Sequence, residues 1–511
     1  MSKHRKAVIQ KLRQEGIFLY DDHKLVSRRD FLGAGILNFT AVMSAPTIFS
    51  LLKSTPALAG CADTAVAPVL PAFLEVRLAG GAAMYKIKMP TLANGDPLPN
   101  YSLLGMGNAA YASNKAQPLL QASFGTYLDI QRGFFRGFNR FDKPEGAARS
   151  AVTTAQAKSA VFNVPVQSGD DSANNAYSLR GVLSMMGSGK GAYLPQLSTG
   201  GEHRQLSVAP DEPPAPLLVE GLPSILRALE PPGPLGVQFS RAERGALFDL
   251  LKELGLRRTA EMAERGVTNA SSLTHLVNCT ASSNAETSRA NPPAIDPRSD
   301  TRLQEIWGFA ANTSVNADSV KLCSIIVSLA KGHSGSASMT FGGYDYHTGE
   351  PTSGRTKREQ AGTFIAQALE TFAYLNAKAV IYLTSDGATY HDALDNPEES
   401  IAPGQTQPGA PVRGDRGEGG QAVVFLHDPA GRPTLVANDG SPLKDQVGYY
   451  TTGQAAARDF IAGWGTERAS MAVLRNVAQF AGPSAVARFN QLFPGYFSNA
   501  ELQKVVKLPL G

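Results

Sequence analysis

The sequence predicts an α/β fold, with a mostly parallel central sheet flanked by helices and with loop-rich insertions. Helical and strand patterns alternate between residues 318 and 387, which is typical of parallel strands joined by crossover helices. The segment 377–387 is almost continuously apolar, as expected of a strand buried on both faces. The chain has 511 residues, of which 43% are hydrophobic and 18% charged, with 50 glycines and 33 prolines. This is a globular composition rich in turns.

The N-terminal segment 1–60 has the organisation of an export signal. Arg28 and Arg29 are followed by Phe31 and Leu32, and then by a mildly apolar stretch that ends in small residues. This arrangement resembles the twin-arginine (Tat) signal. We expect the Tat translocase to export the chain to the periplasm or envelope, and the segment 61–511 to form a single domain. The alternative is an uncleaved anchor, although a transmembrane helix needs about 20 apolar residues and this run is interrupted.

The three cysteines leave two questions open. Cys61 follows Leu58-Ala59-Gly60, which resembles a lipobox, while Ala57-Leu58-Ala59 resembles a signal-peptidase site. Cleavage at the first site predicts a lipid-anchored protein and cleavage at the second predicts a soluble one, which we favour slightly. In an oxidising compartment Cys279 and Cys323 either form a disulfide or remain two buried thiols.

The charge distribution argues against a nucleic-acid partner. The formal net charge is +4, and much of this excess lies in the basic stretch that precedes Asp30, so the remaining chain is close to neutral. No later basic run is interleaved with aromatic residues, as a nucleic-acid surface would require. We expect membrane association only through a lipid anchor or an uncleaved signal.

The first half of the exported chain predicts one clear strand. Residues 72–81 alternate between apolar and polar and then reach Gly80 and Gly81, which indicates a strand with a glycine exit. The proline-rich insertion at about 205–238 predicts a surface connection.

A helix is expected directly after this connection. Ser240 and Glu243 form a capping box. The buried stripe of this helix is expected to consist of Leu247, Leu250, Leu251 and Leu254.

The next four elements alternate between helix and strand. Residues 318–332 predict a helix that starts at Asp318 and ends at Gly332, and the apolar run that starts at Ser336 predicts a strand. Thr356 and Glu359 are expected to cap the following helix. Its apolar positions include Phe364, Ile365, Leu369, Phe372 and Leu375.

Chemically active residues follow the two strands of this unit. Asp345 and His347 come after the first strand, and Asp386 comes directly after the second. Parallel strands end at the same edge of a sheet, where ligands of open α/β sheets bind, and residues two apart in an extended segment face the same way. The spacing therefore predicts a site for a divalent metal such as zinc or manganese. The alternative is that Asp345 caps a turn and His347 is a hydrogen-bonding residue.

Four segments resemble a family of twin-arginine-exported bacterial proteins known only as a domain of unknown function (fifteen-oh-one). The family is assigned to the alkaline phosphatase and sulfatase superfamily, so the resemblance implies an alkaline phosphatase-like core. Asp345 and His347 match the family motif Gly-Gly-Trp-Asp-Thr-His, and Asp386 stands where the family has Glu. The resemblance is good from about residue 303 to 430 and thin between 100 and 240. The segments are "VRLAGGAAMYKIKMP" (76–90), "FGGYDYH" (341–347), "LTSDGATYH" (383–391) and "RGDRGEGG" (413–420).

Two departures from the family pattern lead to two hypotheses. Ala83 replaces an acidic residue, and Asp415-Arg416 stands where the family has Asp-His; His391 or His427 are candidate substitutes. In the first hypothesis the chain is a metal-dependent hydrolase of phosphate or sulfate esters. Its ligands are then Asp345, His347, Asp386 and Asp415. In the second, the same fold is a non-catalytic periplasmic or envelope-associated protein that binds an anionic small molecule or an envelope component.

Overall fold

The computed structural model describes most of one compact unit, Leu58–Gly511. The structure describes part of this chain. That part consists of residues 70–88, 90–96, 98, 120–121, 124, 126–127, 134–138, 154–166, 178–188, 191, 194–200, 206, 215–229, 240–266, 274, 277–278, 295–344, 354–385, 390–391, 412–413, 420–438, 441 and 443–510.

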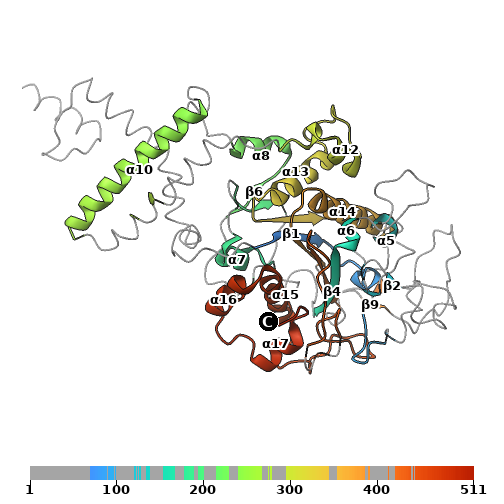
Figure 1. The fold of residues 1–511 in the computed structure, drawn as a ribbon. Coiled ribbons are helices and arrows are strands. Elements are labelled where there is room, and N and C mark those ends of the chain that lie inside the picture. Colours follow the sequence, from blue (N-terminus) through green and yellow to red (C-terminus); the bar gives the residue numbers. More distant parts are fainter. Residues whose placement is uncertain are drawn as a thin grey trace, which may run out of the picture. The chain divides into compact units, whose positions relative to one another are not determined.

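A seven-stranded sheet with the order β4-β11-β8-β1-β7-β5-β6 forms the centre of this unit (Figure 1). Strands β8, β1, β7, β5 and β6 are mutually parallel, whereas β11 is antiparallel to both of its neighbours, β8 and β4. The predicted mostly parallel α/β fold is therefore confirmed. The strands are β1 (Ala72–Leu78), β4 (Ser159–Val166), β5 (Leu197–Ser198), β6 (Leu217–Leu218), β7 (Ser336–Phe341), β8 (Ala379–Ser385) and β11 (Gly420–His427).

Strand β1 lies between β7 and β8. The two strands that precede the predicted ligands are therefore not adjacent in the sheet. The helix that links them therefore carries the chain across β1. Two strand spacings of about 4.8 Å each separate the backbones of β7 and β8.

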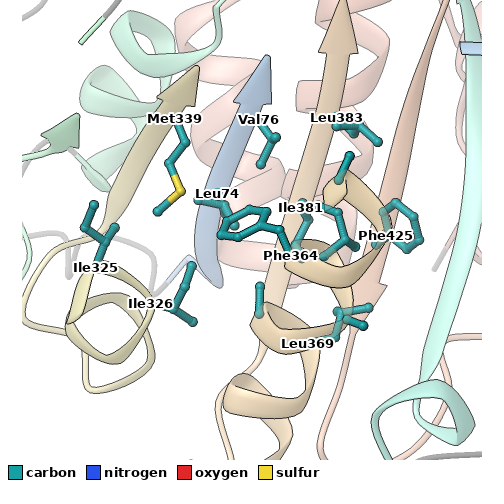
Figure 2. Packing of buried hydrophobic residues seen from close by; sticks show 14 of the residues in the cluster. Leu74, Val76, Ile325, Ile326, Met339, Phe364, Leu369, Ile381, Leu383 and Phe425 are labelled. Carbon is teal, nitrogen blue, oxygen red and sulfur yellow. The ribbon is translucent and has the colours of Figure 1, made fainter. Parts of the chain in front are cut away.

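Helices α5, α12, α13 and α14 pack with one face of the sheet in a single hydrophobic cluster. Leu74 and Val76 of β1 point to this face, because alternate residues of a strand lie on the same side. Figure 2 shows Leu74 beside Phe364 of α14, with Ile326 of α13 below them. The helices are α5 (Phe134–Phe138), α12 (Thr301–Trp307), α13 (Asp318–Ala330) and α14 (Gly354–Tyr374).

The opposite face of the sheet belongs to a second cluster, which contains Phe73 of β1 and Tyr382 of β8. Residues of α15 and α16 belong to this cluster. Helices therefore cover both faces of the sheet. The helices of this second cluster are α7 (Arg180–Leu183), α15 (Thr466–Ala481), α16 (Pro483–Leu492) and α17 (Asn499–Val505).

Two glycines let α5 and α14 approach each other closely. A Cβ atom on Gly362 of α14 would lie 1.8 Å from the backbone oxygen of Phe134, and one on Gly137 of α5 would lie 1.8 Å from that of Glu359. Side chains at these positions would collide with backbone on both helices. The two glycines thereby fix how α14 lies across α5.

The helix from Asp318 and the buried strand at 379–385 are confirmed. Helix α14 begins at Gly354, so Thr356 and Glu359 lie inside it and do not cap it. Its predicted apolar positions Phe364, Ile365, Leu369 and Phe372 are buried.

Helix α10 (Arg241–Glu264) has the predicted capping box, because Ser240 Oγ accepts from Glu243 N and the Glu243 carboxylate accepts from Ser240 N. Its predicted buried stripe is wrong, since Leu250 is 51% exposed and Leu254 is 40% exposed. The periodicity indicated a helix but did not show that another element covers it.

The remaining described elements are short. The proline-rich connection contains β6 and an unpredicted helix, α8. No described helix combines the length and apolar character needed to cross a membrane. The short elements are η1 (Met84–Lys86), β2 (Leu120–Gln121), β3 (Thr126–Tyr127), α6 (Thr154–Ala157), η3 (Ser184–Ser188), α8 (Leu222–Leu229), η4 (Pro297–Ser299), β9 (Tyr390–His391) and β10 (Val412–Arg413).

Candidate functional site

The carboxyl ends of β1, β7 and β8 lie level at one edge of the sheet, called here the carboxyl edge. Leu78 of β1 pairs with Phe341 of β7 on one side and with Ser385 of β8 on the other. The sequence continues from these strand ends to Asp345 and Asp386. The chain segments that lead to both carboxylates therefore leave the sheet at the same edge.

The predicted metal ligands themselves, Asp345, His347, Asp386 and Asp415, lie outside the described residues. Their convergence on one ion therefore stays a prediction. Within the described part of the chain, no group of three His, Cys, Asp or Glu residues is placed to hold a metal ion.

A two-stranded ribbon relates the segments that carry Asp386 and Asp415. Tyr390 of β9 pairs with Arg413 of β10 in antiparallel register. Asp386 precedes β9 and Asp415 follows β10, so both segments leave from the same end of this ribbon. Strand β11 begins at Gly420, beyond the end of β8, because Val423 pairs with Leu383. The segment with Asp415 thus connects to the carboxyl edge as well.

Three glycines follow β1 and β7 at the carboxyl edge. Gly80, Gly81 and Gly343 have φ angles of 112°, 87° and 85°, which residues other than glycine rarely adopt. The Tyr344 amide donates to Ala79 O (3.1 Å) and joins the two glycine exits. The backbone turns directly after β7 and hydrogen-bonds to the end of β1, and this turn requires glycine.

A lysine that the sequence analysis did not single out lies beside this turn. Lys357 of α14 places Nζ 3.4 Å from the position that a Cβ on Gly343 would take. Tyr344 Oη donates to the carbonyl of the same lysine (2.7 Å). The first turns of α14 therefore stand at the end of β7 and bring a half-buried positive charge to the carboxyl edge.

Ser385, the last residue of β8, supplies a hydroxyl next to the glycine exit of β1. Ser385 Oγ accepts from Ala82 N (2.6 Å) and donates to Leu78 O (3.1 Å). Ser385 is 7% exposed. Its two hydrogen bonds connect the turn after β1 to the end of β8. Only the pairing of β1 with β8 reveals it, because Ser385 and Leu78 lie far apart in the sequence.

Ala83, which stands where the resemblance implies an acid, is 1% exposed and belongs to the hydrophobic cluster with Leu78. It carries no donor atom in its side chain. This position therefore contributes packing in place of a ligand.

His427 is excluded as a substitute ligand at this edge. Strand β11 runs antiparallel to β8, and His427 pairs with Ala379, the first residue of β8. It lies at the opposite edge, fully buried, with Nδ1 3.0 Å from Ser159 Oγ. Burial lowers the pKa of His427 to about 4, which makes it a neutral structural residue. His391 lies in β9, and the structure does not describe its side chain.

Cys323 is a free, fully buried thiol in α13. Burial raises the pKa of this thiol, so it is unreactive at neutral pH. Its predicted partner Cys279 lies outside the described residues. So do the predicted signal residues Arg28 and Arg29, the candidate lipid-attachment residue Cys61, and Arg416.

No family model, no curated protein and no solved structure matches this chain. The geometry of the carboxyl edge is therefore the main guide to function.

Proposed function

We propose that the carboxyl edge is the active site of an exported, metal-dependent hydrolase of phosphate or sulfate esters, related to the alkaline phosphatase and sulfatase superfamily. One observation carries the proposal: β7 and β8 end, and β11 begins, at the carboxyl edge, so the chain segments that contain the four predicted ligands connect to that edge. Ligands of α/β sheets bind on this side.

The donor set fits a divalent metal. Carboxylates and an imidazole bind zinc or manganese, and Asp345, His347, Asp386 and Asp415 are the candidates. Strand β1 separates β7, which precedes Asp345 and His347, from β8, which precedes Asp386. These side chains would therefore have to extend over the glycine exit of β1 to share an ion. When bound, a metal here would polarise the ester oxygen and lower the pKa of a bound water.

The substrate class follows from the charge at the edge. Lys357 offers a cation 3.4 Å from the Cβ position of Gly343, and a lysine ammonium binds phosphate or sulfate oxygens as a point charge. Among the described residues nothing lies within 4 Å of a Cβ position on Gly342, so an anion could approach the backbone there. Both features favour a small anionic ester.

The second candidate function is a non-catalytic binding protein on the same fold. Ser385 favours it, because this hydroxyl has one donor and one acceptor contact and is 7% exposed. Ala83 favours it too, since it supplies no ligand. In this alternative the edge binds an anionic envelope component without chemistry.

The experiment separates the two candidates on full-length chain exported by a Tat-competent host. Metal content is measured together with hydrolysis of p-nitrophenyl phosphate and p-nitrophenyl sulfate, for the wild type, His347→Ala and Asp386→Asn. Asp318→Asn serves as the matched control, because this carboxylate is 83% exposed on the surface of α13. The hydrolase predicts bound metal and turnover that both variants lose and the control keeps. Metal-free protein without turnover contradicts it and favours the binding protein.

Export by the Tat route is the second part of the proposal and has its own test. Replacing Arg28 and Arg29 by lysine is expected to keep the chain inside the cell with its signal uncleaved, because the paired arginines are the recognised feature of the signal. Unchanged export of this variant contradicts the Tat assignment. The mass of the exported chain distinguishes a lipid on Cys61 from cleavage at Ala59.

A further inference from the structure

A cavity of about 490 Å³ lies where α13 and α14 end, shortly before the chain enters β7 and β8. It is called here the amino-edge cavity, because these strands begin on the side of the sheet away from the carboxyl edge. Asp300 and Arg302 beside the start of α12, Lys331 after α13 and Tyr374 at the end of α14 line it. Its volume lies in the range of small-molecule sites, and every residue that lines it belongs to the described part of the chain.

Tyr374 and Asp300 form an acidic side of this cavity. Tyr374 is 46% exposed, and its hydroxyl donates to Asp300 Oδ2 (3.1 Å), so the ring is held beside the carboxylate. Asp300 Oδ1 accepts from the amides of Arg302 (2.9 Å) and Leu303 (3.1 Å). All three donors are neutral groups, so they do not compensate the negative charge of Asp300.

The second carboxylate of the cavity, Asp296, already has a cationic partner. Arg298 Nη2 lies 2.7 Å from Asp296 Oδ2, and Arg298 Nε lies 2.9 Å from Oδ1, which is a bidentate ion pair. Asp300 is therefore the carboxylate that favours a cationic group of a ligand. The exposed ring of Tyr374 and the C-terminal ends of α13 and α14 favour the same charge.

Arg302 and Lys331 bring positive charge to the same cavity. Arg302 Nη1 lies 2.9 Å from Glu305 Oε2, but the two side chains are 47% and 59% exposed. An exposed pair of this kind is weak, so a ligand carboxylate can compete with Glu305 for the guanidinium. Lys331 is exposed as well.

The charges of both signs decide which class of ligand fits. Two acids and two bases line the cavity, so a simple cation or a simple anion would be repelled by part of the lining. A ligand that carries one group of each sign meets an opposite charge on both sides. The cavity therefore favours a small zwitterion.

We propose that the amino-edge cavity binds a free α-amino acid. The ammonium group of the amino acid contacts Asp300 and the ring of Tyr374, and its carboxylate contacts Arg302 and Lys331. The remaining volume accommodates the side chain of the amino acid. This binding is independent of the carboxyl edge, so it stands or falls separately from the proposed hydrolysis.

The test is isothermal titration of the common L-amino acids, one at a time, into the full-length chain. We expect at least one of them to bind. Its N-acetyl derivative and its amide derivative, each of which lacks one charge, should bind at least about tenfold more weakly, because each loses hydrogen bonds to a charged group. Maltose serves as the probe for a neutral saccharide. The proposal is overturned if no amino acid binds, if the derivatives bind as tightly as the parent amino acid, or if only maltose binds.

Two variants place the bound amino acid in this cavity. Asp300→Asn removes the charge but keeps an oxygen that caps α12, since asparagine and aspartate are similar N-caps, and Arg302→Gln removes the opposite charge at an exposed position. Each should weaken binding at least about tenfold. Asp318→Asn is the matched control, because this carboxylate lies at the other end of α13, and it should bind as the wild type does. Far-UV circular dichroism verifies the fold of each variant, and wild-type affinity in a folded Asp300→Asn or Arg302→Gln protein overturns the proposal.

Discussion

The contact between α5 and α14 gives the sharpest prediction about stability. Replacing Gly362 by alanine places a Cβ 1.8 Å from Phe134 O and 2.7 Å from Phe134 C, whereas ordinary contact begins at 3.4 Å. Both atoms belong to backbone, so no side chain can rotate away. One helix must therefore retreat from the other until ordinary contact is restored.

The magnitude follows from two opposing effects. Overpacking of a core costs about 1–3 kcal/mol, and this site lies at the upper end because backbone meets backbone. Alanine is a better helix former than glycine by about 1 kcal/mol, which offsets part of the loss. We expect Gly362→Ala to lower the free energy of unfolding by about 1–2 kcal/mol.

Urea unfolding followed by tryptophan fluorescence measures this change, because Trp307 packs against α14 through Phe364. Gly431→Ala is the control, since nothing lies within 4 Å of a Cβ at that position, and it should change the midpoint little. A Gly362→Ala protein as stable as the wild type, or more stable, would refute the close helix crossing.

Three further predictions concern charge, a buried hydrogen bond and pH. Lys357→Gln should weaken competitive inhibition by inorganic phosphate several-fold while metal content stays unchanged, as measured by inhibition kinetics and metal analysis; unchanged inhibition speaks against a role in anion binding. Thr371→Val should cost about 1–3 kcal/mol in urea unfolding, because it leaves the buried Trp307 Nε1–H, now 2.9 Å from Thr371 Oγ1, without its partner; a neutral effect contradicts this. The pKa of His427 falls from 6.5 unfolded to about 4 folded, so its stabilisation is complete above pH 6.5 and is lost as pH falls towards 4. The stability difference between wild type and His427→Gln should therefore shrink by about 2 kcal/mol between pH 7.5 and pH 5, and a constant difference contradicts a neutral buried imidazole.

The fold class could be predicted because its signals are local. The apolar run at 377–387 and the helical periodicity from Asp318 each depend on neighbouring residues, and both elements lie where the pattern put them. Strand order could not be predicted, because insertion of β1 between β7 and β8 joins residues that are distant in the sequence, such as Leu78 and Ser385.

The same limit applies to the candidate site. Asp345 and His347 are visible as a motif, but Ser385 and Lys357 carry no motif and appear only when strands and helices are placed together. His427 is the last residue of β11, and the antiparallel direction of this strand puts it at the opposite edge of the sheet. The predicted burial of Leu250 and Leu254 is wrong, because hydrophobic periodicity does not show whether another element covers a helix.

The central claim is that side chains from the ends of β7 and β8 reach across β1 to share one cation. Isothermal titration of Mn²⁺ or Zn²⁺ into the wild type, His347→Ala, Asp386→Asn and the double variant tests it as a thermodynamic cycle. Ligands of one ion are coupled, so we predict that the double variant departs from the sum of the two single losses by at least about 1 kcal/mol of binding free energy. Losses that add to within about 0.5 kcal/mol, or a wild-type chain that binds neither metal, would contradict the shared site.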